Sequence, residues 1–134
     1  MDIKHPIIIL TSLCILFSIF NCTNLDYESY TFIIPVDSLV IPDSIVLNDT
    51  LEIRFFGIIG NNGCYSFEKL EAIEQQLSIQ LTAIGKFTGA ATCTSVMVDL
   101  EESYFVTPSL AGQYYIEVLQ PDNTVLRDSV LVIR

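Results

Sequence analysis

The stretch Leu77-Ser-Ile-Gln-Leu-Thr-Ala83 alternates strictly between apolar and polar side chains. This period of two places every apolar side chain on one face of an extended chain, the pattern of a half-buried β-strand. A strand needs a hydrogen-bonded neighbour, and the nearest candidate along the chain is residues 64–76. We therefore expect a hairpin that turns at Gln75-Gln76.

Residues 64–76 also fit a second interpretation as a helix. Four apolar residues keep the spacing of one helix face: Phe67, Leu70, Ile73 and Leu77. The hairpin is favoured because the strand after this segment would otherwise have no local partner. The choice between helix and strand for residues 64–76 therefore stays open.

Several other segments carry strand patterns. Residues 31–34 and 44–47 are short β-branched runs bounded by Pro35 and Pro42, which indicates edge strands. Three glycines within residues 57–63 indicate a loop. Further strands are expected at residues 50–58 and 94–100. Residues 114–119 and 124–133 are expected to form a final hairpin across Gln120-Pro-Asp-Asn123. The chain from 31 to 134 is therefore predicted to be an all-β antiparallel sandwich of about 7–9 strands.

The N-terminal segment carries a different pattern. Residues 7–20 hold no charge and follow Lys4 and His5. A membrane-spanning helix needs roughly 20 apolar residues and a signal-peptide core about 7–15, so the run fits a removed leader. An uncleaved membrane anchor and ordinary secretion are the alternatives.

The residues around Cys22 resemble the lipobox of bacterial lipoproteins, in which cleavage precedes a cysteine that becomes acylated. Asn21 stands where the strict motif has a small residue, and Ile19 where it has Leu. The resemblance implies a signal peptide over 1–21, lipidation of Cys22, and a tether over 22–30. With Thr23 after the cysteine, it implies sorting to the outer membrane of a Gram-negative cell envelope.

Removal of the leader leaves two cysteines, Cys64 and Cys93, since Cys14 lies in the leader and Cys22 takes the lipid. In an oxidising envelope such a pair is expected to form a disulfide. A free redox thiol is the alternative, although no basic partner lies near either cysteine in the sequence.

Charge and composition limit the function. The net charge is −10, and removal of residues 1–21 takes away Asp2 and Lys4 without changing it. Such a surface repels nucleic-acid phosphates. The only histidine, His5, leaves with the leader, so no Ser-His or Cys-His couple and no histidine-bound zinc remains. We expect a protein that is not an enzyme and needs no cofactor or metal.

The stretch Leu110-Ala-Gly-Gln-Tyr114 resembles the tyrosine corner of immunoglobulin-like sandwiches, in which the tyrosine hydroxyl bonds to upstream backbone. Gly112 and Tyr114 would form it; a plain core aromatic at Tyr114 is the alternative. Together with Gly63-Cys-Tyr-Ser-Phe67, Ala91-Thr-Cys93 and Asp128-Ser-Val130, the chain resembles small immunoglobulin-like envelope lipoproteins, many without an assigned function. This resemblance covers about residues 38–134 and implies fold and location only.

Four Asp-Ser/Thr-aliphatic triplets occur, more than random placement predicts. They resemble O-glycosylation acceptors of some Gram-negative envelope systems, and they also suit strand starts, where a turn-forming Asp precedes a hydroxyl residue. The acceptor hydroxyls would be Ser38, Ser44, Thr50 and Ser129.

Two groups of carboxylates stand out, and both are expected to be solvated faces. They are Glu68, Glu71 and Glu74, and Asp99, Glu101 and Glu102. The expected function is a lipid-anchored binding or structural module of the envelope with a protein or glycan partner. The alternative is an accessory subunit of a larger surface assembly for adhesion or glycan uptake.

Overall fold

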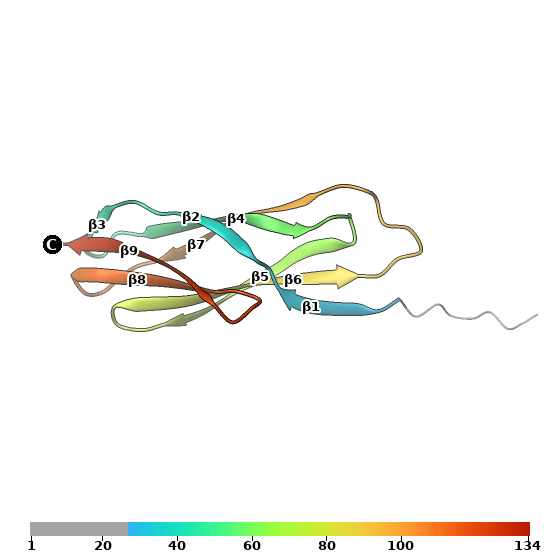
Figure 1. Ribbon diagram of the computed structural model, residues 1–134. Helices are drawn as coiled ribbons and strands as arrows, with labels where there is room; N and C mark the ends of the chain where they lie inside the picture. The colour runs from blue at the N-terminus through green and yellow to red at the C-terminus, as the bar shows by residue number, and fades with distance from the viewer. Residues whose placement is uncertain (1–26) are drawn as a thin grey trace, which may run out of the picture.

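The structure, a computed structural model, describes residues 27–134 and contains nine strands and no helix within them (Figure 1). The strands are β1 (Ser29–Ile33), β2 (Val36–Val40), β3 (Ser44–Val46), β4 (Leu51–Gly60), β5 (Tyr65–Glu74), β6 (Ser78–Thr88), β7 (Val98–Val106), β8 (Gly112–Leu119) and β9 (Val125–Ile133). They form two sheets packed as a sandwich, so the predicted all-β fold is confirmed and is consistent with an immunoglobulin-like architecture.

The hairpin predicted around residues 77–83 is confirmed. β5 and β6 pair antiparallel along their length, and the Gln75 N–H donates to the Ser78 carbonyl oxygen at 2.8 Å across the turn. The helical interpretation of residues 64–76 is wrong. Ile73 and Leu77, which would have lain on the buried helix face, are both exposed.

The larger sheet has the order β1–β6–β8–β9–β3, with β5 on the opposite side of β6. β1 pairs with residues 84–88 of β6 and β8 with residues 78–81, so the two share one side of that strand. The smaller sheet has the order β2–β4–β7. Within residues 27–134, β1 pairs only with β6 and β3 only with β9, so each has one unpaired side, which confirms the two predicted edge strands.

The prediction that all strands pair antiparallel is wrong. β6 pairs with β8, and β3 with β9, in parallel. For β6 and β8 the reason is that β7, which lies in the smaller sheet, carries the chain back between them. β8 therefore enters the larger sheet running in the same direction as β6. β8 thus lies beside the second strand of the β5–β6 hairpin, whereas the immunoglobulin order C–F–G places it beside the first.

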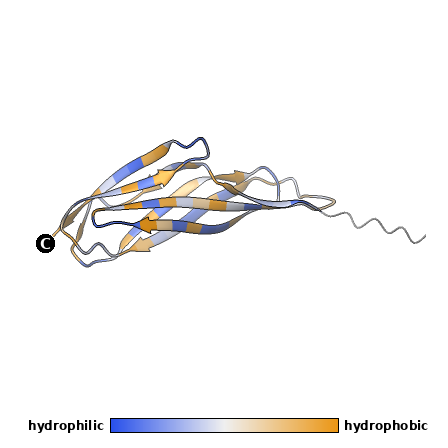
Figure 2. Ribbon diagram, turned by 90° about the horizontal axis from the view of Figure 1, so that it is seen from below, coloured by the Kyte–Doolittle hydropathy of each residue, from blue (hydrophilic) through white to orange (hydrophobic). Residues whose placement is uncertain are grey.

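The core lies between the two sheets and is built by alternation along the strands. Its largest fully buried side chains come from both layers: Ile34, Leu51, Ile53, Phe55, Ile79, Leu81, Leu100, Ile116, Val118, Val130 and Val132. Figure 2 shows apolar and polar residues alternating along these strands. Each fully buried Leu, Ile, Val or Phe contributes about 1.5–3 kcal/mol relative to an exposed side chain. The exception in the opening stretch is Leu77, which precedes β6 and stays exposed.

Some predicted boundaries move. Residues 57–60 belong to β4 rather than to a loop, because a bulge near Ile58 lets the strand continue and buries Ile59. β7 starts at Val98, four residues after the predicted start at 94, and runs on to Val106. β2 was not predicted.

The predicted tether over 22–30 ends too late, because Ser29 and Tyr30 pair with β6 as part of β1. The predicted signal peptide over 1–21 and the lipid site at Cys22 lie outside the described residues. Among residues 27–134, the structure has no helix long and apolar enough to cross a membrane.

Candidate functional site

The outer face of the smaller sheet carries an ordered set of polar side chains. Along β4, Leu51, Ile53 and Phe55 point into the core, so the alternating residues Glu52 and Arg54 point outward. Glu52 pairs with Phe105 of β7, and Arg54 pairs with Ser103 of β7 and Val40 of β2. Three strands therefore contribute to one surface.

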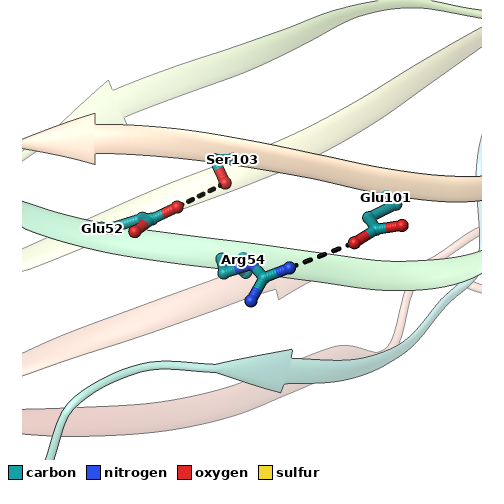
Figure 3. Close-up of polar contacts among 4 residues, drawn as sticks. All are labelled: Glu52, Arg54, Glu101 and Ser103. Atoms are coloured by element: carbon teal, nitrogen blue, oxygen red, sulfur yellow. Dashed lines mark hydrogen bonds and ion pairs between the residues drawn. The ribbon is translucent and has the colours of Figure 1, made fainter.

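Two diagonal polar contacts join β4 to β7 on this face (Figure 3). The Arg54 guanidinium donates from Nη2 to Glu101 Oε1 at 3.1 Å, and the Ser103 hydroxyl donates to Glu52 Oε1 at 2.8 Å. Arg54 also lies over the ring of Phe56, with Cζ 5.2 Å from the ring centroid. Each charged group is held in place, although exposed pairs of this kind add only about 0–1 kcal/mol to stability.

A depression of about 400 Å³ opens beside these contacts. Its lining combines apolar side chains with one cation, one carboxylate and one hydroxyl: Val40, Ile41, Pro42, Thr50, Glu52 and Arg54. Phe105, which is 60% exposed, pairs with Glu52 at the far side of β4. A surface with one oriented charge of each sign fits an uncharged partner rich in hydroxyl or amide groups.

A second depression, of about 320 Å³, lies at the β8–β9 turn and Pro35. Here the Val36 N–H donates to Gln120 Oε1 at 3.1 Å, which ties the turn of the larger sheet to the first residue of β2. Gln120 Nε2 is buried without a hydrogen-bond partner. The contact holds the two sheets together at this side.

Tyr114 is buried, and Gly112 has a φ of 135°, at the start of β8. Burial, and then the nearby Glu74 carboxylate and Tyr104, raise the pKa of Tyr114. The ring packs in the core. The tyrosine corner at Gly112 and Tyr114 stays a prediction.

Tyr104 of β7 and Glu74 of β5 connect the two sheets at their other side. The Tyr104 hydroxyl donates to Glu74 Oε1 at 3.2 Å. Burial raises the pKa of Tyr104, and the hydrogen bond to Glu74 raises it further. Both strands are sheet edges, so this contact closes the sandwich where no strand pairing does.

Cys64 and Cys93 form the predicted disulfide, with Cα atoms 5.4 Å apart. The bridge joins the turn before β5 to the loop between β6 and β7. The Gly63 N–H donates to the Thr94 carbonyl oxygen at 2.8 Å beside it. Residues 29 apart in the sequence are thereby fixed at one end of the sandwich.

The four candidate acceptor hydroxyls do not share one setting. Ser44 begins β3 and Thr50 precedes β4, whereas Ser38 and Ser129 lie within β2 and β9. Ser38, Ser44 and Thr50 are exposed, and Ser129 is half-buried. The interpretation of the triplets as strand starts therefore accounts for two of the four.

The two predicted acidic groups are not organised as a metal site. Within residues 27–134, no group of three or more His, Cys, Asp or Glu side chains is placed to hold a metal ion. Glu101 binds Arg54, Glu74 accepts from Tyr104, and Glu71 Oε1 lies 2.7 Å from Lys69 Nζ. Glu71 raises the pKa of Lys69 through this contact.

The alternating charges of Glu52 and Arg54 are visible in the sequence, but their partners on β7 are not. Glu101 and Ser103 meet them only because β4 and β7 pair in one register across about 50 residues. No protein family matches the chain, and no curated protein or solved structure does either.

Proposed function

We propose that the protein is a non-enzymatic binding module of the cell envelope, held at the outer membrane by a lipid on Cys22. The binding role rests on Arg54 and Glu52 beside the 400 Å³ depression. These two side chains are held in place by separate contacts, Arg54 with Glu101 and Glu52 with Ser103. The leader and the cysteine at 22 support the location.

The chemistry of the face favours a neutral glycan or an uncharged segment of a protein. Arg54 and Glu52 keep unused hydrogen-bonding capacity, since each is engaged at one end only. Hydroxyl and amide groups of a partner can hydrogen-bond to both Arg54 and Glu52, and no charged group of the partner then has to lose its water. The acidic surface makes nucleic acid an unsuitable partner.

A matched pair of variants tests this surface. Arg127 Nε lies 2.9 Å from Glu117 Oε1 on the outer face of the larger sheet, so Arg127→Ala/Glu117→Ala is the chemical control for Arg54→Ala/Glu52→Ala. Each protein is purified in mild detergent from its native envelope, and bound proteins and glycans are identified by mass spectrometry. Loss of the partner in the Arg54/Glu52 variant alone supports the proposal, and equal retention in both contradicts it.

The second candidate, an accessory subunit of a larger adhesion or glycan-uptake assembly, differs in stoichiometry. A fixed ratio to a large protein in the same purification favours it over an independent module.

The lipid is tested directly. Fatty acid label that is incorporated into the full chain and lost in Cys22→Ala supports the anchor, and unchanged labelling excludes it.

We also propose that at least one of Ser38, Ser44, Thr50 and Ser129 is O-glycosylated. The exposure of the first three supports access by a glycosyltransferase. Intact-mass and peptide analysis of native protein that shows all four hydroxyls bare removes this proposal.

A further inference from the structure

Three segments meet at one end of the sandwich, which we call the proximal end: residues 27–30, 61–64 and 89–97. The Gly89 N–H donates to the Glu28 carbonyl oxygen at 3.0 Å, and the Thr88 N–H to the Cys64 carbonyl oxygen at 2.9 Å. The C-terminus lies at the opposite end (Figure 1). The N-terminal part of the chain thus joins the domain at the proximal end.

The chain is attached to the domain from Tyr27 onward. A Cβ on Gly89 would lie 2.8 Å from the Glu28 carbonyl oxygen and 3.1 Å from Tyr27 Cβ, so a glycine is needed where this segment packs on the loop. Five residue steps separate Cys22 from Tyr27. At about 3.6 Å per step, they reach roughly 18 Å at most. A lipid on Cys22 would therefore keep the proximal end close to the bilayer surface.

The proximal end has a surface suited to that position. Its exposed side chains include Tyr27, Tyr30, Val96 and Met97, the last of which is 57% exposed. Glu28 is its only charged residue, in a chain of net charge −10. Tyrosine favours the membrane interface, because its ring enters the apolar boundary while its hydroxyl stays among the headgroups.

We propose that the proximal end rests in the interfacial region of a zwitterionic bilayer through Tyr27, Tyr30, Val96 and Met97. This inference rests on the proposed lipid anchor at Cys22. The acidic side chains, which an anionic leaflet would repel, then lie away from the surface. The Cys64–Cys93 bridge holds the loop that presents Val96 and Met97.

The chain contains no tryptophan, so one introduced residue reports its own environment. Met97→Trp places the probe at the proximal end. Phe105→Trp is the control, since eight residues of extended chain separate the positions by about 26 Å. Both side chains are exposed, which makes both substitutions compatible with folding. Each lipidated full-length protein is reconstituted into phosphatidylcholine and phosphatidylethanolamine vesicles, with and without lipid brominated near the headgroup.

We expect the emission of Trp at position 97 to shift to shorter wavelength and to be quenched by the brominated lipid, with neither change at position 105. Equal quenching at both positions, or none at either, in protein that carries the lipid label overturns the inference and leaves the proposed anchor standing. A chain that takes up no label at Cys22 overturns both. Circular dichroism of each variant confirms that the sandwich is intact.

Discussion

The carbonyl oxygen of Pro35 lies 2.5 Å from the position that a Cβ on Gly57 would occupy. Pro35 is where the chain leaves β1 in the larger sheet and enters β2 in the smaller one, so this close approach sits at the crossing between the layers. Because the opposing atom belongs to the backbone, it has no side-chain rotation by which to move aside. Only glycine at position 57 permits the crossing as it stands.

Gly57→Ala is expected to lower the free energy of unfolding by about 1–3 kcal/mol, the usual cost of forcing extra atoms into a packed site. Gly63→Ala is the control, since its Cβ would meet Thr94 Cβ at 3.4 Å, an ordinary contact. Urea unfolding of both variants measures the difference. Equal stability of the two variants would contradict the prediction, because it would mean that the backbone at Pro35 moves away from the new Cβ at no cost.

Loss of the Cys64–Cys93 bridge is expected to lower the free energy of unfolding by roughly 3–4 kcal/mol, from the entropy of the loop that it closes in the unfolded chain. Urea unfolding of Cys64→Ser/Cys93→Ser against the oxidised protein measures the loss. Adding reductant should bring the unsubstituted protein to the same midpoint and leave the variant unchanged. A bridge without effect would mean that the unfolded chain already keeps these segments together.

Stability is expected to fall as the pH rises above about 10, the ordinary pKa of tyrosine. Burial raises the folded-state pKa of both Tyr104 and Tyr114. Their contribution is therefore fully present below the unfolded pKa and is lost as the pH rises through the folded values. Urea midpoints measured from pH 8 to 11 should decline less steeply in Tyr104→Phe/Tyr114→Phe. Tyr115→Phe, an exposed position, should follow the unsubstituted protein.

Thr124→Val is expected to raise the pKa of Asp122 toward its ordinary value. The Thr124 hydroxyl donates to Asp122 Oδ1 at 2.6 Å and its backbone N–H donates at 2.9 Å, and these two bonds hold the pKa of Asp122 below that value. The contribution of Asp122 is present above its unfolded pKa and is lost as the pH falls through the lower folded value. NMR titration of the Asp122 carboxyl measures the shift. An unchanged titration would assign the effect to the backbone bond alone.

Asp128→Ala is expected to increase self-association. β8 covers one side of β9, and on the other side β3 pairs only with residues 131–133, so among residues 27–134 the side of residues 125–129 that faces away from β8 has no strand beside it. The Ser129 N–H donates to Asp128 Oδ1 at 2.7 Å. The carboxylate thereby occupies a backbone N–H that could otherwise form a hydrogen bond with a strand of another molecule. Sedimentation velocity at several concentrations tests this, with Asp49→Ala as the control. A monomeric Asp128→Ala protein would show that the edge is protected by other means.

The alternation of apolar and polar residues predicted those strands that bury one face in the core and expose the other. The alternation at residues 77–83 and 50–58 identified β6 and β4, because burial of every second side chain requires that period. β5 was predicted as a strand only because β6 needs a hydrogen-bonded partner, and its position at the edge of the sheet explains why its own pattern was ambiguous. β2 escaped prediction, since its five residues alternate poorly around a bulge.

The sequence by itself determined the all-β class and the β5–β6 and β8–β9 hairpins, since each depends on side-chain period or on residues close along the chain. It predicted the Cys64–Cys93 bridge, whose cysteines are 29 residues apart, because these two remained once Cys14 and Cys22 were assigned to the leader and the lipid. The tertiary structure decided the parallel pairing of β6 with β8 and the meeting of Arg54 and Glu52 with Glu101 and Ser103. Those features depend on which sheet each strand joins and in which register. That choice is made by packing two apolar faces across the core, and no local pattern encodes it.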